Sequence, residues 1–332
     1  CLGNEMDGPW QICRKTADEY GRIAQETGKL MRMVDPTIQL SACGSSMWDM
    51  PTYGTWEDTV LDHCFEQVDF LSLHSYFMNP HDSTEEYFGN IELTDNFIKQ
   101  TVAIADAVAA RKRSAKRIML SFDEWNVWYK ARSIEDLRKP GWPVAPRLIE
   151  EVYNYEDALV VGGALITLMN NCDRVKVACL AQLVNVIAPI FSTKEGSWYQ
   201  TIFYPLQLFA THCHGTSLDT FVDCDTYALG GERIPYLDVS AAYDNEAGEV
   251  IVNVTNRHRE QAITTDILCQ TGRFGGKATV YEVNGPDIKA ENSMTRQAVK
   301  TVTKEAQARG DRFTYAFPAH SFTLIRIPVV TD

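Results

Sequence analysis

Two glutamates in this chain have surroundings that suit acid–base chemistry. Glu124 comes just after the apolar run at residues 117–122 and just before Trp125 and Trp128. Such a run predicts a strand of a parallel sheet, and an α/β barrel carries its active site where such strands end. Glu5 repeats the pattern, with apolar residues before it and a Gly-Pro-Trp turn after it. A lone strand-end glutamate often only caps a helix, whereas two in aromatic settings predict the acid/base and the nucleophile of a glycosidase.

A retaining glycosidase needs its two carboxyl groups about 5 Å apart, one protonated and the other ionised. The mouth of a barrel brings together residues that are distant in sequence, because all strand ends point into it. We expect the like charge of one glutamate to raise the pKa of the other, which would keep a proton available near neutral pH.

The sequences LGNEMDGPWQ and SFDEWNVWY resemble the acid/base and nucleophile motifs of the glycoside hydrolase family 51 α-L-arabinofuranosidases. The segments CGSS, HSYF, LAQLVNVIAPI and FYPLQLFATHCHGTSLD resemble the family in the same order. The resemblance implies that Glu5 is the acid/base and Glu124 the nucleophile of an exo-acting, retaining enzyme. Its substrates would be arabinan, arabinoxylan and arabino-oligosaccharides that end in α-L-arabinofuranosyl residues. The family likeness also implies a homo-oligomer, a hexamer or a trimer, without a cofactor or a metal.

Three further residues lie in these motifs and are candidates for substrate binding. Asn4 adjoins Glu5, and the resemblance implies that it donates a hydrogen bond to the sugar 2-hydroxyl. His74 and Tyr76 are two residues apart on one predicted strand, so their side chains point to the same side. Tyr76 is placed to hydrogen-bond Glu124 and keep it ionised. Without the resemblance, such a His-x-Tyr sequence is more often part of a core.

Other residues near the motifs receive different predictions. Gln182 lies at a predicted strand end inside an apolar run, where an unpaired amide is costly, so we expect it to bind sugar hydroxyls. Trp128 offers a flat face for a sugar ring, whereas Trp10 is expected to form only a wall of the site. Asp7 and Asp123 flank the two glutamates and are interpreted as scaffold.

The segment His212-Cys213-His214 contains residue types that bind metals. It has no partner cluster elsewhere in the sequence, and structural zinc needs four ligands. We therefore predict that it makes a packing contact where two domains join. The sequence also lacks a glycine-rich phosphate loop and a nucleophile elbow, so we predict no metal and no cofactor.

The composition excludes some classes of partner. The 332 residues include 44 acidic and 31 basic ones, for a net charge of -13, which disfavours nucleic acid and anionic membranes. The apolar stretches are too short to span a bilayer. Nine scattered cysteines, an odd number, argue against a disulfide framework and predict a reduced, cytoplasmic protein.

Residues 1–213 alternate predicted strands and helices, which is typical of a parallel sheet. Strands are predicted at 38–43, 68–76, 117–122 and 175–182, and helices at 16–34, 55–66, 91–111, 155–169 and 199–210. Thr16 and Glu19 predict a capping box at the first helix. The apolar face expected there comprises Tyr20, Ile23, Ala24, Thr27, Leu30, Met31 and Val34. Residues 130–146 are predicted to form a functional loop.

Residues 214–332 contain short alternating segments, which predict an antiparallel, jelly-roll-like β-sandwich. Residues 1–213 hold about five βα units, counting a strand that ends at Glu5, whereas a closed TIM barrel needs eight. We therefore expect the part of a (β/α)8 barrel from its fourth strand onward, completed by residues outside a truncated chain. Two alternatives stay open: another retaining two-glutamate barrel glycosidase, such as a xylanase or endoglucanase, or an inactive sugar-binding fragment.

Overall fold

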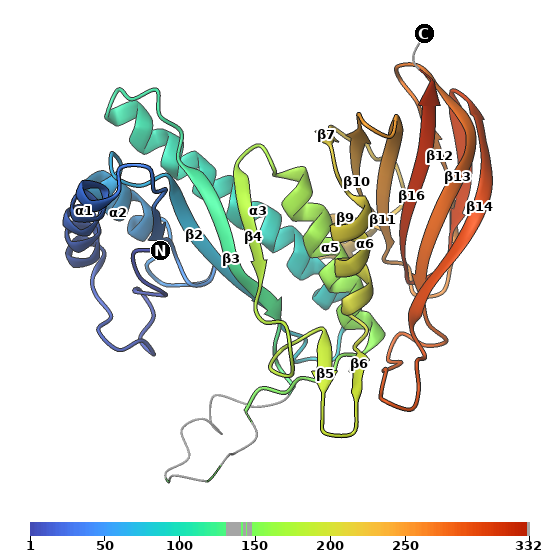
Figure 1. The fold of residues 1–332 in the computed structure, drawn as a ribbon, viewed down its shortest axis with the longest axis horizontal. Helices are drawn as coiled ribbons and strands as arrows, with labels where there is room; N and C mark the ends of the chain where they lie inside the picture. Colours follow the sequence, from blue (N-terminus) through green and yellow to red (C-terminus); the bar gives the residue numbers. More distant parts are fainter. Residues whose placement is uncertain (131–140, 142–143, 145–147, 331–332) are drawn as a thin grey trace. The chain divides into compact units, whose positions relative to one another are not determined.

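The structure, a computed structural model, describes residues 1–130, 141, 144 and 148–330 (Figure 1). Nearly all of the loop predicted at 130–146 lies outside the described residues. The chain divides into two compact units. The first consists of Cys1–Tyr76, Glu92–Asn126 and Asn171–Ala181, and the second of Phe77–Ile91, Val127–Asn170 and Gln182–Asp332.

A four-stranded parallel sheet forms the centre of the first unit, in the order β1-β2-β3-β4. Its strands are β1 (Ser41–Cys43), β2 (Phe70–Phe77), β3 (Met119–Val127) and β4 (Val175–Leu180), which confirms the four predicted positions. Leu71, Leu73 and Leu120 are fully buried in β2 and β3, as the apolar runs predicted. In β4, however, residues 176–179 are exposed.

Three helices contribute to the first unit: α1 (Ala17–Val34), α2 (Thr55–Cys64) and the later part of α3 (Thr84–Arg111). The predicted capping box at the start of α1 is confirmed. Only part of the predicted apolar face of α1 is buried. Tyr20 and Ala24 are buried, and Tyr20 stacks on Trp56 of α2. Leu30 and Val34, in contrast, are 62% and 82% exposed.

The second unit is built around helix α5 (Tyr155–Asn170), which is buried along almost its whole length. The helix packs against an antiparallel sheet through strands β10, β11 and β16, and Gly162 leaves room there for Phe322. The sheet has the order β12-β15-β14-β13-β16-β11-β10-β7. These strands are β7 (Thr216–Leu218), β10 (Leu237–Asp244), β11 (Glu249–Asn256), β12 (Ile263–Leu268), β13 (Arg273–Asn284), β14 (Lys300–Gly310), β15 (Arg312–Phe317) and β16 (Ser321–Val330).

The antiparallel sheet curls at the β14–β15 connection. In the described part of the chain, those two strands pair through Arg309 and Arg312, on either side of the turn at Gly310. Beyond the turn, Phe313 and Phe317 of β15 join a core with Val252 of β11 and Ile325 of β16. These eight strands therefore form one continuous hydrogen-bonded sheet, and its curl encloses the core.

Smaller elements complete the second unit. They are the hairpins β5 (Ile190–Ser192) with β6 (Ser197–Tyr199) and β8 (Thr226–Leu229) with β9 (Glu232–Pro235), and helix α6 (Phe203–His212). Helix α6 begins later than predicted, because Tyr199 ends the β5–β6 hairpin. Among the described residues, no helix combines the length and apolar character needed to cross a membrane.

Candidate active site

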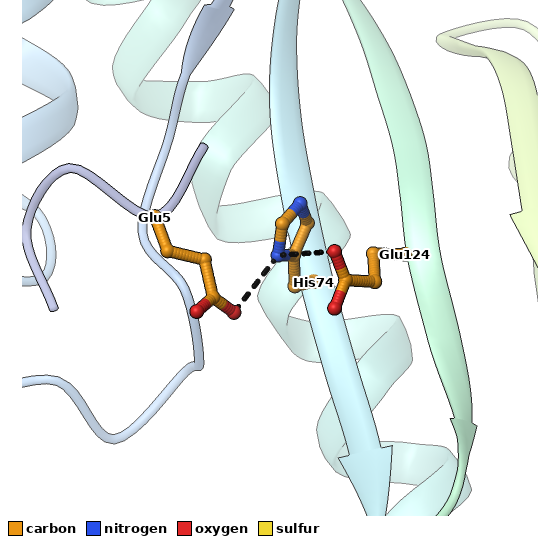
Figure 2. Close-up of side chains that lie close together, drawn as sticks. All are labelled: Glu5, His74 and Glu124. Carbon is orange, nitrogen blue, oxygen red and sulfur yellow. Dashed lines mark hydrogen bonds and ion pairs between the residues drawn. The ribbon is translucent and has the colours of Figure 1, made fainter. Parts of the chain in front are cut away.

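Glu5, His74 and Glu124 converge within the first unit (Figure 2). Glu5 comes from the turn before α1, His74 from β2 and Glu124 from β3. One ring nitrogen of the histidine and one carboxylate oxygen of each glutamate lie within 4.8 Å of one another. His74 Nδ1 is 3.1 Å from Glu5 Oε1 and 3.7 Å from Glu124 Oε2. The sequence-predicted pair of glutamates thus lies close together, with the histidine between them.

Tyr76 reaches the same cluster from β2, two residues beyond His74, as the period of a strand requires. Its hydroxyl donates to Glu124 Oε1 at 2.6 Å, which confirms the predicted hydrogen bond. Burial and the charge of Glu124 raise the pKa of Tyr76, so the phenol keeps the proton that it donates. This leaves Glu124 Oε2 on the side that faces His74.

The segment that carries Glu5 is a turn, so the prediction of a strand ending at Glu5 is wrong. The described residues 1–8 contain no strand, although Leu2 N donates to Ser41 O of β1. Glycine and proline in this segment favour turns, and Glu5 itself has a φ of 46°. Asp7 ties the turn down, because it accepts hydrogen bonds from the backbone and hydroxyl of Ser46.

The electrostatics of the cluster differ from the expectation that one glutamate raises the pKa of the other. Burial raises the pKa of Glu5, but hydrogen bonds from His74 and Trp10 and the charge of His74 outweigh it, so the pKa lies below its ordinary value. Burial lowers the pKa of His74, yet its contacts with the carboxylates of Asp123 and Glu5, with the charge of Glu124, raise it to about 9. The pKa of Glu5 therefore moves opposite to the prediction, because a cation stands between the two acids.

Three contacts of the cluster were missed by sequence reasoning. Trp10, predicted to be only a wall, donates from Nε1 to Glu5 Oε2, and Gln11 Nε2 donates to the same oxygen at 3.3 Å. Asp123, predicted to be scaffold, lies 3.3 Å through Oδ1 from His74 Nε2. The short spacing of Trp10 and Gln11 from Glu5 could have indicated their contacts. No sequence signal pairs Asp123 with His74.

The remaining candidates are less closely tied to the cluster. Asn4 is exposed beside Glu5, while Trp128 and Gln182 belong to the second unit. Gln182 is exposed, two residues after β4 ends, so the premise that its amide is buried is wrong. His212 of α6 stacks on the Tyr281 ring of β13 at 4.2 Å, a packing contact within the second unit.

Comparison with known proteins gives consistent results. The family Alpha-L-arabinofuranosidase C-terminal domain matches residues 123–321. The intracellular exo-alpha-(1->5)-L-arabinofuranosidase of Halalkalibacterium halodurans is 44% identical over 331 residues, covering 98% of this chain and 66% of that protein. An enzyme of the same name from Bacillus subtilis, numbered 1, is 44% identical over 301 residues, covering 90% and 60%.

Solved structures resemble the whole described fold. AbfB, a family 51 alpha-L-arabinofuranosidase from Bifidobacterium longum, superposes with a TM-score of 0.87 at 32% identity, covering 98% of this chain and 66% of that one. The chain thus spans 60 to 66% of the length of these three relatives. The sequence match, the relatives and the shared fold show that the chain belongs to the glycoside hydrolase family 51 α-L-arabinofuranosidases.

Proposed function

We propose that the protein is a retaining exo-α-L-arabinofuranosidase that releases terminal α-L-arabinofuranosyl residues from arabinan, arabinoxylan and arabino-oligosaccharides. The observation that carries this proposal is the approach of Glu5 and Glu124, which place one carboxylate oxygen each within 4.8 Å. Retaining enzymes hold their carboxyl groups about 5–5.5 Å apart, whereas inverting enzymes need about 6.5–9.5 Å to admit a water molecule. The printed activities of the relatives support the choice of sugar.

In this mechanism Glu124 attacks the anomeric carbon and forms a covalent glycosyl ester. Tyr76 holds Oε1 of Glu124, which leaves Oε2 for the attack. Glu5 protonates the departing oxygen and then accepts a proton from the water that hydrolyses the ester. Trp10 and Gln11 occupy Oε2 of Glu5, so a substrate oxygen that approaches this atom would replace their hydrogen bonds.

The other candidate residues are proposed to bind the sugar. Asn4, exposed beside Glu5, would donate to the 2-hydroxyl, an interaction that strengthens as positive charge develops on the ring. His74 would contact the sugar from between the two glutamates, Trp128 would stack on its apolar face, and Gln182 would bind hydroxyl groups. Replacing each of them should raise KM or lower kcat without abolishing turnover.

We further propose that residues 1–213 are the part of a (β/α)8 barrel from its fourth strand onward, and that residues 214–332 are a jelly-roll-like β-sandwich domain. In support, β1 and β4 are edge strands of the described parallel sheet, and residues 176–179 of β4 are exposed. An open strand edge leaves backbone groups without partners, and parallel sheets are normally covered on both faces. Additional strands would cover the open edges and the exposed part of β4. The proposal also includes a cytoplasmic location, since relatives are named intracellular. The protein is further proposed to be a homo-oligomer that binds neither nucleic acid nor a membrane.

The test uses the extended protein, meaning the longest reading frame that encodes this chain. It should hydrolyse an aryl α-L-arabinofuranoside, and proton NMR should show that the first product keeps its anomeric configuration. Residues 1–332 alone should be nearly inactive, because a misplacement of about 1 Å can cost on the order of a hundredfold in rate. Hydrolysis of a β-xyloside or cellobioside without any arabinofuranosidase activity would contradict the proposal and favour a xylanase or endoglucanase. Equal activity of the 332-residue chain would contradict the incomplete barrel.

A further inference from the structure

Asp123 occupies the side of His74 that faces away from the two glutamates. Its Oδ1 lies 3.3 Å from His74 Nε2, while His74 Nδ1 faces Glu5 at 3.1 Å and Glu124 at 3.7 Å. The His74 side chain is 5% exposed. Nδ1 forms a hydrogen bond with Glu5, whereas Nε2 is only at ion-pair distance from Asp123, whose Oδ1 has no hydrogen-bond partner among the described residues. A neutral imidazole has a lone pair on one nitrogen, and on either side that lone pair would face a carboxylate. The geometry therefore favours the imidazolium by charge.

The charges around His74 are unbalanced. The carboxylates that face it are those of Glu5 from the turn before α1 and of Asp123 and Glu124 from β3. On the neighbouring strand β1, burial raises the pKa of Cys43, so its thiol adds no charge near neutral pH. Three carboxylates thus surround one ring. Together they raise the pKa of His74 to about 9, and Asp123 is the first of the partners that raise it.

This arrangement conflicts with a simple acid role for Glu5. An acid catalyst must hold a proton when the leaving group departs, yet hydrogen bonds from His74 and Trp10 keep the pKa of Glu5 below its ordinary value despite burial. At neutral pH the proton of the free site is then on the histidine and not on the glutamate. Either the enzyme works only in acid, or the proton moves from one group to the other.

We propose that Glu5 and His74 share one catalytic proton, and that Asp123 is the positioning residue that holds the ring in line and retains this proton. The inference rests on the proposed role of Glu5 as the acid/base. When substrate approaches, the proton passes from Nδ1 to the Glu5 carboxylate, and the electron pair of the N–H bond stays on Nδ1. Glu5 then gives the proton to the leaving oxygen. In the second step Glu5 takes a proton from the attacking water and returns it to Nδ1, so the cycle balances.

The proposal predicts where the activity is lost as the pH rises. Two coupled groups lose their protons in two steps whose apparent values belong to the pair, and the shared proton leaves in the second, more alkaline step. The alkaline limb of kcat/KM should therefore lie near the titration of the histidine and not near that of a carboxyl group. Asp123→Asn keeps an oxygen to accept from Nε2 but removes a negative charge, so both titrations should move to lower pH by about one unit or more.

The experiment is an NMR titration of the ring of His74 in the extended protein, alongside pH–rate profiles. The His74 signal is assigned by its loss in His74→Asn. Asp7→Asn is the matched control. Asp7 is two residues from Glu5 in the sequence, as Asp123 is next to Glu124, but it accepts a hydrogen bond from the backbone of Ser46 and is not among the contacts of His74 described above. We expect the wild-type ring to titrate well above 7, Asp123→Asn to shift both the ring and the alkaline limb, and Asp7→Asn to leave the ring titration unchanged.

Three results would overturn the proposal: a wild-type ring that titrates near 6.5 or below, equal shifts in Asp123→Asn and Asp7→Asn, or an unchanged alkaline limb in Asp123→Asn. The wild-type titration needs only His74→Asn, which assigns the signal. It therefore tests the proposal even if Asp123→Asn does not fold. The ring titration also needs no turnover. An absence of arabinofuranosidase activity would therefore contradict the proposed function, while a ring at its ordinary value in an active enzyme would contradict only the shared proton.

Discussion

Two clusters of carboxylates, one in each unit, use charge differently. In the first unit three carboxylates surround one histidine that can lose its proton. In the second unit, Glu156 and Asp157 lie at the start of α5 with their side chains 0% exposed, and each has a lysine. Lys130 Nζ is 2.5 Å from Asp157 Oδ2, and Lys289 Nζ is 2.6 Å from Glu156 Oε2. One cluster, the unbalanced cluster, has three carboxylates around one histidine. In the other, each buried acid has a lysine, and Lys289 also pairs with Asp82, whose side chain is 82% exposed; we call the buried pairs Asp157–Lys130 and Glu156–Lys289 the balanced cluster.

The contacts of the balanced cluster are those of a cluster that stabilises the fold. Asp157 also accepts from the Tyr87 hydroxyl and from the backbone of Asn154, and acidic groups are favoured at a helix N-terminus. Burial lowers the pKa of Lys289, but its hydrogen bonds to Asp82 and Glu156 outweigh burial and raise it. Burial raises the pKa of Asp157 even though Lys130 lies beside it. In the histidine cluster the pKa of His74 is raised to about 9, so that cluster changes its charge just above neutral pH. The comparison indicates that carboxylates around a group that titrates near neutral pH are suited to catalysis, whereas buried acids that each pair with a lysine are suited to a structural role.

The largest expected effect comes from removing Glu124 of the unbalanced cluster. Glu124→Ala in the extended protein should lower kcat by on the order of 10⁴-fold or more, because no other group can form the glycosyl ester. Azide should restore part of the turnover and give a product of inverted configuration, since it attacks directly from the vacated side. An azide product of retained configuration would assign the nucleophile to Glu5 or another group.

The next effect depends on the leaving group. Glu5→Ala should lower kcat/KM by about 10²–10⁴-fold for arabino-oligosaccharides, whose leaving oxygen needs a proton. The loss should be much smaller for an activated aryl arabinofuranoside, and the alkaline limb of the pH profile should weaken. Kinetics on both substrates provide the measurement. An equal loss on both would be incompatible with the acid/base role.

The unbalanced cluster should also make stability depend on pH. The pKa of His74 is raised from about 6.5 unfolded to about 9 folded, so its contribution is fully present below pH 6.5 and is lost as the pH rises through 9. A shift of this size corresponds to about 3 kcal/mol. The free energy of unfolding should therefore fall more between pH 6.5 and 9 in the wild type than in His74→Asn. Parallel pH curves for the two proteins would show that the histidine is not held as a cation.

The sequence allowed prediction of those features that depend on local spacing. The capping box at Thr16 follows from a fixed offset of three residues, and the bond from Tyr76 to Glu124 follows from the two-residue period of a strand. The burial of α1 was only partly predictable. Periodicity identifies the apolar face of a helix, but it does not show how much of that face a neighbouring element covers. Strand β14 was missed because its exposed, charged residues give no apolar alternation.

The electrostatics of the site could not be predicted in the same way. Whether Asp123 contacts the ring of His74 depends on the orientation of a side chain on a neighbouring strand, and no sequence offset encodes that orientation. The contact of Trp10 with Glu5 was missed for a different reason: its short spacing could have indicated the contact, but the segment was predicted to end a strand and is a turn. Residue types and motifs therefore indicate which residues belong to the site. Which of them lie in contact, and so which charged group changes the pKa of which acid, depends on the folded structure.

The smallest expected effect tests the balanced cluster. Asp157→Asn leaves Lys130 beside a neutral amide, and because that lysine is 26% exposed, it can turn partly to water. We expect a loss of about 1–3 kcal/mol in the free energy of unfolding, measured by urea denaturation, with kcat/KM per folded molecule unchanged. Glu305→Gln is the matched control, since the Lys277–Glu305 pair has the same 2.5 Å separation but is more than 60% exposed on both sides. Its loss should stay within about 0.5 kcal/mol, because exposed ion pairs contribute little. If the two variants lose equal stability, burial does not distinguish the pairs, and the structural role of the balanced cluster is refuted.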